Sequence, residues 1–401
     1  MLKQTIKKKI LEVLHSVPEQ EVSVLEHLIT QGISNYLEFS YPKFMEKTLG
    51  YIDSLRVAPY VYRFASSTGP SLYASIYACM LLGLFGEIDR MAECEKREWK
   101  EYFDSFQSEE DGLFYSEELN CEEYLENGTW GDGWGKRHLA GHIIIAYKRL
   151  GFLPRYRISC YDDLYDESTF QKWIEQFQFR DKAWSESNYI MNAYVVLQYN
   201  RDFFHDERAG AVVERIKKWL SNRQNPESGM WNAEEIKNAD DLNVAIRAAY
   251  HLYPLFEYDN ENAFSTVATI DYILRSENKW GGFTTEGVVA GACEDIDAID
   301  PLIRCALQYK DYKTEEIHFA LKKSMIWVLS NFNNDGGATF YIENEHHYGD
   351  HPLTTSLKNE SNLFATWFRT LSLVYICQYL DLPNSFSITR NPGYENCLRG
   401  L

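Results

Sequence analysis

The spacing of apolar residues predicts a chain built from helices that come in pairs. Six segments repeat apolar side chains at the three- and four-residue intervals of an amphipathic α-helix, and no stretch shows the alternation of a β-strand. Another helical segment precedes each of the six and ends in an aromatic–aliphatic pair, such as Tyr51-Ile52 or Trp219-Leu220. A polar turn with Gly and an aromatic residue follows most of these pairs. The six segments cover residues 70–88, 136–150, 187–200, 239–256, 293–309 and 361–380.

The repeated unit of helix, turn and helix predicts the fold class. One helical hairpin cannot bury its own apolar face, so six of them are expected to close on one another. We therefore predict an all-α protein whose single domain, residues 39–381, is an (α/α)6 toroid, with an inner barrel of six helices inside an outer barrel of six. Residues 1–38 are expected to form an N-terminal helical extension, and residues 382–401 a C-terminal tail.

Two of the turns resemble turns of known enzyme families. The stretch WLSNRQNPESGMW, from Trp219 to Trp231, has the order aromatic, aliphatic, three residues, Gln, four residues, Gly, one residue, Trp. It resembles the QW repeat of squalene–hopene cyclases, and Gly281-Gly282-Phe283 resembles the turns of protein prenyltransferase β subunits. Both families are α/α toroids. The resemblance implies an enzyme of the class II terpene cyclase or prenyltransferase type, acting on an isoprenoid or an isoprenoid diphosphate.

Crowded carboxylates at the start of the fifth helix are the leading catalytic candidates. In the cyclases, the motif D-x-D-D opens an inner helix just after a QW-type turn. Two stretches resemble that context: Glu294-Asp295-Ile296-Asp297 and Asn238-Ala239-Asp240-Asp241. The first lacks the final Asp of the motif, and the second has Asn in its first position. The resemblance implies that the initiating acid lies among these residues: Asp297, Asp300, Asp295 and Glu294, supported by Asp240 and Asp241.

The chemistry of cyclisation explains why such a cluster would be needed. Protonation of an alkene requires an acid that still holds its proton at neutral pH, and neighbouring carboxylates raise one another's pKa. Aromatic side chains around the cavity would then stabilise the carbocation. Helix capping is the competing interpretation, because Asp300 before Pro301 fits an N-cap followed by proline, and Asp240 or Asp241 fits the same role on the preceding helix.

Polar stripes on the inner helices predict which side chains line the lumen. Inner helices bury their apolar faces against the outer ring, so their polar faces are expected to point to the centre. The arginines on these stripes could grip a diphosphate or a carboxylate through two hydrogen bonds each, or could join the helices in a buried ion-pair network. The predicted substrate-binding residues are Asn243, Arg247, His251, Arg304, Asn362, Arg369, Trp134 and Asn192.

A polar lumen keeps two other functions open. Asp, Asn, Arg and His suit a sugar or a uronic acid better than a bare hydrocarbon. The first alternative is therefore a carbohydrate-active α/α toroid, such as a polysaccharide lyase, hydrolase or epimerase, with Asp297 or Asp300 as the general acid. The second is a non-catalytic toroid that acts as a binding subunit. An aromatic, dry lumen would favour the isoprenoid hypothesis. A lumen filled by side chains would favour the non-catalytic protein.

Three residues are candidate metal ligands. His138 and His142 are four residues apart on a helical pattern, a spacing that can share one metal ion. Cys293 adds a third ligand type, and the prenyltransferases that the chain resembles use Asp, Cys and His for zinc, although order and spacing differ here. Magnesium held by carboxylates together with a diphosphate substrate is the cofactor that we favour over zinc.

Composition narrows the partners and the compartment. The formal net charge of −19 argues against nucleic acid and against an anionic membrane as partners. Eight scattered cysteines without a C-x-x-C pair are typical of reduced thiols. No segment has the apolar run of a signal peptide or a membrane span, although Lys7-Lys8-Lys9 beside apolar residues leaves a peripheral membrane contact open. We expect a cytoplasmic protein with a small-molecule or glycan substrate, in an oligomeric state that the sequence leaves open.

Overall fold

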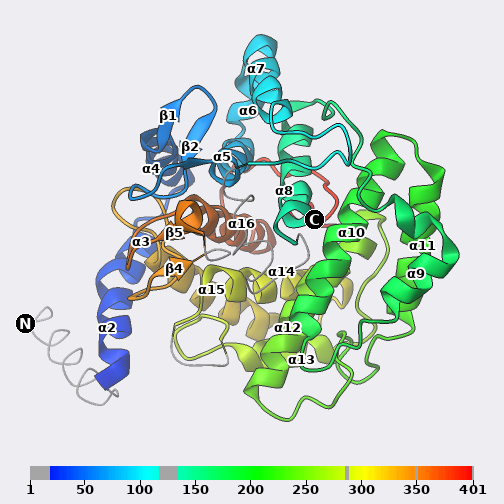
Figure 1. The fold of residues 1–401 in the computed structure, drawn as a ribbon. Helices are drawn as coiled ribbons and strands as arrows, with labels where there is room; N and C mark the ends of the chain where they lie inside the picture. Colours follow the sequence, from blue (N-terminus) through cyan, green and yellow to red (C-terminus); the bar gives the residue numbers. More distant parts are fainter. Residues whose placement is uncertain (1–18, 117–133, 285–288, 348–350, 400–401) are drawn as a thin grey trace, which may run out of the picture.

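A closed ring of helices forms the centre of the molecule (Figure 1). The computed structural model describes residues 19–116, 134–284, 289–347 and 351–399. Within these residues, six helices contact one another in chain order, and the last returns to contact the first. Each overlaps one of the six segments that the apolar spacing predicted. The ring helices are α5 (Leu72–Leu84), α8 (Trp134–Leu150), α10 (Ala183–Phe203), α12 (Ala239–Tyr258), α14 (Ala292–Gln308) and α16 (Leu363–Tyr379).

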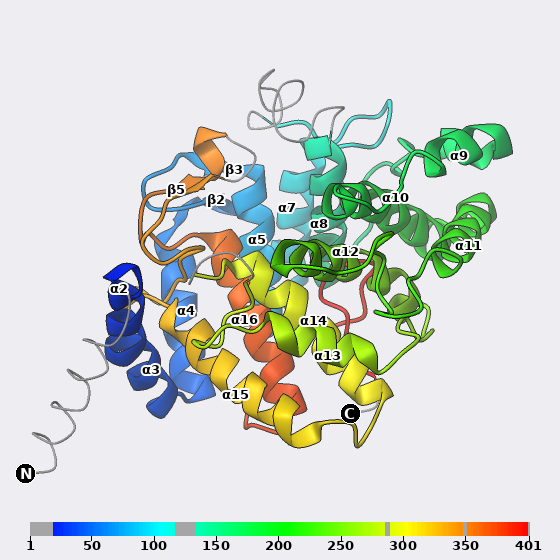
Figure 2. The ribbon, with the colours of Figure 1, turned by 90° about the horizontal axis from the view of Figure 1, so that it is seen from below.

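Another helix precedes each ring helix in the chain, and most of these pack on the outside of the ring (Figures 1 and 2). They are α4 (Tyr41–Ser54), α7 (Glu93–Asp104), α9 (Glu167–Ile174), α11 (Glu207–Ser221), α13 (Ala268–Ser276) and α15 (Thr314–Ser330). α7 packs against α8, α11 against α10, α13 against α12 and α14, and α15 against α14 and α16. Burial explains the division, because α5 is buried on nearly every face, whereas α11 buries one stripe that includes Val212, Val213 and Ile216.

Glycine turns join neighbouring outer helices. After α13 the chain turns at Gly281, whose φ is 95°, and a Cβ there would lie 2.5 Å from the carbonyl oxygen of Lys323 on α15. After α15 the chain turns at Gly336, whose φ is 92°, and a Cβ there would lie 2.2 Å from the carbonyl oxygen of Lys47 on α4. Both positions therefore require glycine. The second contact joins the last outer helix to the first.

Two small antiparallel sheets stand outside this helical plan. β1 (Arg56–Ala58), β2 (Val61–Arg63) and β3 (Pro70–Ser71) pair in that order, and β4 (His346–His347) pairs with β5 (Thr355–Ser356). The expectation of no strand is wrong for these segments, because strands of two or three residues are too short to show an alternating pattern. The chain is therefore a mostly helical single domain rather than an all-α one. The short helices are α6 (Glu87–Arg90), η4 (Asp162–Tyr165) and η5 (Pro352–Thr354).

The described part of the N-terminal extension packs against the helical body. α2 (Glu19–His27), the π-helical turn η1 (Leu28–Gly32) and α3 (Ile33–Leu37) follow one another, and both η1 and α3 contact α15. Asn35 donates a hydrogen bond to the backbone carbonyl of Leu329 at 2.9 Å. The predicted membrane contact through Lys7-Lys8-Lys9 lies outside the described residues. Among the helices that the structure describes, none combines the length and the hydropathy needed to cross a bilayer.

Residues 391–397, which we call the C-terminal segment, fill the end of the ring at which its helices finish. Arg304, in the last turns of α14, donates to the backbone oxygen of Asn396 at 2.6 Å. Glu395 accepts from the indole of Trp367 at 2.6 Å and from Arg149, at the end of α8, at 3.0 Å. The predicted tail thus inserts part of its length between ring helices.

Candidate functional site

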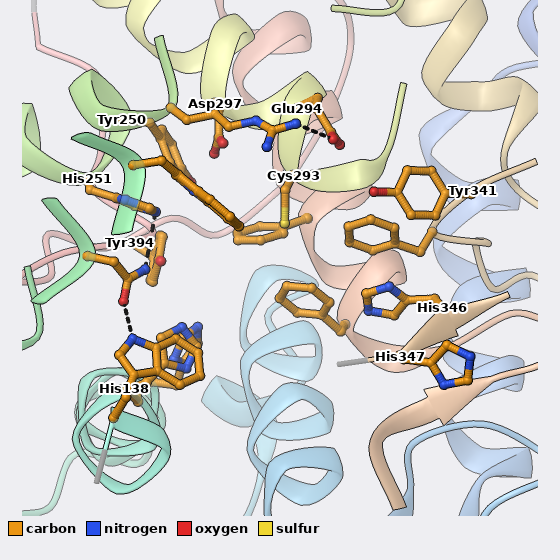
Figure 3. A pocket seen from close by; sticks show the side chains of 18 of the residues that line it. His138, Tyr250, His251, Cys293, Glu294, Asp297, Tyr341, His346, His347 and Tyr394 are labelled. Carbon is orange, nitrogen blue, oxygen red and sulfur yellow. Dashed lines mark hydrogen bonds and ion pairs between the residues drawn. The ribbon is translucent and has the colours of Figure 1, made fainter. Parts of the chain in front are cut away.

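A cavity of about 280 Å³ lies between ring helices (Figure 3). Five ring helices border it, together with the chain between α15 and α16 and the C-terminal segment. The C-terminal segment contributes Tyr394, whose ring centroid lies 5.0 Å from that of His142 and 5.7 Å from that of Tyr250. The lining side chains are Trp134, His138, His142, Trp184, Asn188, Arg247, Tyr250, His251, Cys293, Glu294, Asp297, Phe340, Tyr341, Glu345, His346, His347, Phe364, Phe368 and Tyr394.

Aromatic rings form most of the cavity wall. Phe340 and Phe364 stack with centroids 5.8 Å apart and ring planes 12° apart, and His346 stacks on Phe340 at 3.8 Å. On the α8 side, Trp134 stacks on His138 at 4.3 Å. The faces of aromatic rings carry partial negative charge and attract cations. The wall is therefore suited to an apolar ligand, and to positive charge that develops on it.

Asp297 is the acid of the predicted cluster that reaches this cavity without a partner. Its side chain projects from α14 (Figure 3), and the residue is 3% exposed. Its carboxyl makes no hydrogen bond or ion pair with any other residue in the described part of the chain. Burial raises the pKa of its carboxyl well above the usual range, Arg247 opposes that shift, and Glu294 adds to it. A carboxyl in such surroundings can keep its proton near neutral pH.

The backbone next to this acid lacks one helical hydrogen bond. α14 begins at Ala292 and continues through Pro301, so the competing interpretation, in which Asp300 caps a helix that begins at Pro301, is wrong. Proline has no N–H, so the helical hydrogen bond from residue 301 to the carbonyl of Asp297 cannot form. The proline that suggested a capping site in the sequence therefore alters the helix one turn after the acid.

Glu294 and Arg247 form an ion pair at the edge of the cavity. Arg247 donates from Nη2 to a carboxylate oxygen of Glu294 at 2.5 Å (Figure 3), and its guanidinium lies over the ring of Trp184 at 5.2 Å. The second carboxylate oxygen of Glu294 and the Nε of Arg247 are buried without a partner among the described residues. The pair thus leaves one acceptor and one donor unsatisfied beside Asp297.

The two other acids of the cluster lie in buried ion pairs outside the cavity. Asp295 and Arg369 are both fully buried, with 2.6 Å between Oδ2 and Nη1. Burial raises the pKa of Asp295 to about 6, and Arg369 opposes the shift. Asp300 accepts from Arg304 at 2.8 Å and also from the hydroxyl of Tyr253. Arg369 and Arg304 therefore take part in the buried network that was the alternative to ligand binding.

The predicted acids on α12 lie away from the cavity. Asp240 is exposed and Asp241 is half-buried at the first turn of that helix, and the cap is Asn238, which accepts the N–H of Asp241 at 2.9 Å. Asn362 likewise caps α16 by accepting the N–H of Ala365 at 2.8 Å. Of the predicted substrate-binding residues, Trp134, Arg247 and His251 line the cavity, whereas Asn192, Asn243, Arg304, Asn362 and Arg369 do not.

Three buried histidines line the part of the cavity that α8 and α12 form. Burial lowers the pKa of His142 to about 4 and that of His251 to about 3, and it lowers that of His138 well below the usual range. All three are therefore neutral at pH 7. The Nδ1 of His142 lies 2.9 Å from the backbone oxygen of His138. Because a carbonyl oxygen only accepts, Nδ1 of His142 carries the proton.

The candidate metal ligands on α8 and α14 line the cavity but do not form a compact ligand set. Groups of three or more His, Cys, Asp or Glu side chains whose ligand atoms lie within 4.8 Å of one another could hold a metal ion. Among the described residues there is one such group, and it consists of Glu214, Asp259 and Glu261. The ammonium of Lys217 lies 2.5 Å from Asp259 and 2.7 Å from Glu261, so a protein cation already neutralises that group. The rings of His138 and His142 lie 4.4 Å apart, but these two candidates and Cys293 do not form such a group.

Several lining residues were not indicated by any helical pattern. Phe340, Tyr341, Glu345 and His346 come from the chain between α15 and α16, and Tyr394 comes from the C-terminal segment. The density of aromatic and histidine residues in 340–347 was the available signal. Their position depends on the pairing of β4 with β5 and on contacts between residues far apart in the sequence, which no local pattern reports.

No protein-family model matches the chain. No curated protein sequence matches it either. Its structure resembles that of type II terpene cyclase MstE from Scytonema in complex with its product merosterolic acid A, with a TM-score of 0.46, 10% identity, and coverage of 84% of this chain and 97% of that chain. The same enzyme in complex with its substrate geranylgeranyl dihydroxybenzoate matches with a TM-score of 0.44, 11% identity, and coverage of 84% and 97%. A protein from Actinoplanes also resembles it (TM-score 0.40, 10% identity, 85% and 99%). All three are distant likenesses of fold, at 10–11% sequence identity.

Proposed function

We propose that the cavity is the active site of an isoprenoid cyclase in which Asp297 donates the proton that starts the reaction. One observation supports this above the others: a buried carboxyl, without a hydrogen bond to any described residue, faces a cavity walled by aromatic rings. Burial keeps such a carboxyl in its neutral, proton-donating form. The closed ring of six helices around the cavity supports the predicted (α/α)6 toroid as the architecture.

The proposed reaction is an isomerisation. The proton of Asp297 passes to one carbon of an alkene, whose π electrons form the new C–H bond and leave a cation on the neighbouring carbon. A second double bond of the same chain then attacks the cation and closes a ring. Aromatic faces, such as those of Phe340, Phe364 and Phe368, stabilise the charge as it moves. The last cation loses a proton and Asp297 regains one from solvent, so substrate and product are isomers.

The ion pair beside Asp297 supports both states of the acid. Before transfer, the negative charge of Glu294 favours the protonated form of Asp297. After transfer, the carboxylate of Asp297 is stabilised by the positive charge of Arg247. The hydrogen bond between Arg247 and Glu294 holds the guanidinium at the edge of the cavity throughout. We propose Arg247 and Glu294 as positioning residues for the acid.

The two alternative functions have less support. The sugar hypothesis relied on arginine and asparagine side chains that converge on the lumen, but Arg304, Arg369 and Asn362 are engaged elsewhere. The non-catalytic hypothesis relied on a lumen filled by side chains, whereas a cavity of about 280 Å³ is open. Both alternatives are outcomes of the experiment that follows.

Turnover with a substrate panel tests the proposal. The purified protein is incubated separately with farnesol, geranylgeraniol, squalene, prenyl diphosphates and acidic oligosaccharides, and the products are identified by mass spectrometry. We expect a cyclic isomer of an isoprenoid, and we expect Asp297→Asn to lower kcat by about 10²–10⁴-fold. Asp89→Asn, the same exchange at an exposed residue of α6, is the matched control and should keep the full rate.

Two results would contradict the proposal in different ways. Conversion of oligosaccharides and of no isoprenoid would exclude the cyclase. Isoprenoid turnover that survives Asp297→Asn would leave the cyclase standing and exclude Asp297 as the acid.

A further inference from the structure

We infer that the site takes an uncharged isoprenoid, such as a prenyl alcohol or a hydrocarbon, and discriminates against a diphosphate ester. This inference rests on the proposed function for the isoprenoid chain itself, and it concerns the charge at the other end of the ligand. The sequence left an isoprenoid and an isoprenoid diphosphate equally open. The charges that border the cavity separate the two.

The charged side chains that line the cavity are mainly acidic. Three carboxyl groups, those of Glu294, Asp297 and Glu345, face a single guanidinium, that of Arg247. Glu294 already binds that guanidinium at 2.5 Å, and Asp297 is held protonated by burial. Glu345 is exposed at the rim of the cavity, where its carboxylate lies 3.3 Å from Nε2 of the exposed His347. A diphosphate placed here would meet like charge.

The buried histidines of the wall do not offset this charge. Burial lowers the pKa of His346 to about 3, as it lowers the pKa of His142 to about 4 and that of His251 to about 3. All three imidazoles are neutral at pH 7, and each can offer a diphosphate at most a hydrogen bond. These three imidazoles thus supply polarity without positive charge.

The cations nearest to the cavity are held by other groups. Arg304 and Arg369 lie in buried ion pairs with Asp300 and Asp295. On the first turn of α8, Lys136 lies over the ring of Tyr115 at 4.1 Å and is outside the lining. None of the three lines the cavity, and each already contacts another side chain.

Binding of a matched pair of ligands tests this inference. Farnesol and farnesyl diphosphate carry the same chain and differ in the head group, and Trp134 and Trp184 in the lining report binding through their fluorescence. Titrations use the full chain, in EDTA and in magnesium, for the wild type and for Asp297→Asn. We expect farnesol to bind at least tenfold more tightly than the diphosphate in both proteins, with no requirement for magnesium.

A charge reversal at the rim sharpens the test. Glu345→Lys replaces the carboxylate at the rim by an ammonium and should narrow the preference for farnesol severalfold by tightening binding of the diphosphate. Glu315→Lys changes the net charge by the same amount at an exposed position of α15 and should leave the preference unchanged. An equal effect of the two variants would mean that the overall charge of the protein, and not the cavity, sets the preference, which would overturn the inference.

The outcomes separate this inference from the proposed function. Tighter binding of farnesyl diphosphate than of farnesol, or a requirement for magnesium, would overturn the inference. Turnover of the diphosphate that depends on Asp297 would, in that case, still support the proposed cyclase function. Preferential binding of farnesol without turnover of any isoprenoid would support the inference on charge and exclude the cyclase. Failure of both ligands to bind would overturn both.

Discussion

Replacing Asp297 with asparagine should make the protein more stable at neutral pH while removing its proposed activity. The folded protein keeps the carboxyl protonated, because burial raises its pKa well above the usual range. In the unfolded chain the same group ionises with a pKa of about 3.9. Above that pH the unfolded state has released a proton that the folded state retains, so unfolding becomes easier as pH rises. The contribution of Asp297 to stability is complete below about pH 3.9 and is lost as pH rises toward its folded pKa.

The size of the effect follows from this difference in bound protons. While the folded form is protonated and the unfolded form is ionised, the free energy of unfolding falls by about 1.4 kcal/mol per pH unit. Between pH 4 and pH 7 the loss is therefore at most about 4 kcal/mol. Asparagine has nearly the same shape and does not ionise, so it avoids this loss. We expect the Asp297→Asn variant to be more stable than the wild type by about 1–4 kcal/mol at pH 7, with a difference that shrinks toward pH 4.

Urea denaturation at pH 5, 6, 7 and 8 measures this difference. The comparison of two proteins at each pH cancels the titration of all other groups, so only the change at Asp297 remains. Asp89→Asn, an exposed residue of α6, should change stability by less than about 0.5 kcal/mol at every pH. A variant that is no more stable than the wild type at pH 7, or a difference that does not change with pH, would refute the idea that Asp297 is a buried neutral acid.

The remaining predictions concern groups around the cavity. Asp295→Asn should lower the free energy of unfolding by about 3–5 kcal/mol in urea denaturation, because it leaves the fully buried guanidinium of Arg369 without its counter-charge. A loss below about 1 kcal/mol would show that this pair is not a buried ion pair in solution. The buried histidines, by contrast, should make the fold sensitive to acid. Burial lowers the pKa of His142 to about 4, below its value of about 6.5 in the unfolded chain. The contribution of His142 to the free energy of unfolding is therefore complete above about pH 6.5 and falls by up to about 1.4 kcal/mol per pH unit as the pH drops toward about 4. His142→Gln should flatten that dependence, and an unchanged slope would mean that His142 is not buried and neutral.

The helical plan could be predicted from the sequence because it depends on local spacing. The apolar period of α11 and the turn that follows it are features of about a dozen neighbouring residues. Gly281 and Gly336 follow from the same logic, since each marks a place where the backbone touches an outer helix. The strands β1 to β5 were missed because two or three residues are too few to show an alternating pattern.

The lining of the cavity could be predicted only in part. Helical spacing indicates that a side chain points to the centre of the ring, but it does not indicate whether the cavity extends to that turn of the helix. Asp297 and Asp300 lie on the same stripe of α14, yet only Asp297 reaches the cavity. Asp300 lies one turn further along, where Arg304 binds both it and the C-terminal segment. The insertion of Tyr394 between ring helices sets this depth, and it depends on contacts between residues about a hundred positions apart, which no local pattern contains.

The acids between Glu294 and Asp300, which look like one cluster in the sequence, have opposite effects on the stability of the folded protein. Asp295 and Asp300 each have a buried arginine partner, so removing either carboxylate should destabilise the protein. Asp297 has no such partner among the described residues, so replacing its carboxyl by the amide of asparagine should stabilise the protein. Natural sequences rarely keep a buried acid unpaired unless its reactivity is used. The sign of the stability change therefore distinguishes the ion-paired acids from the buried neutral acid within a single helix, and it can be measured before any substrate is known.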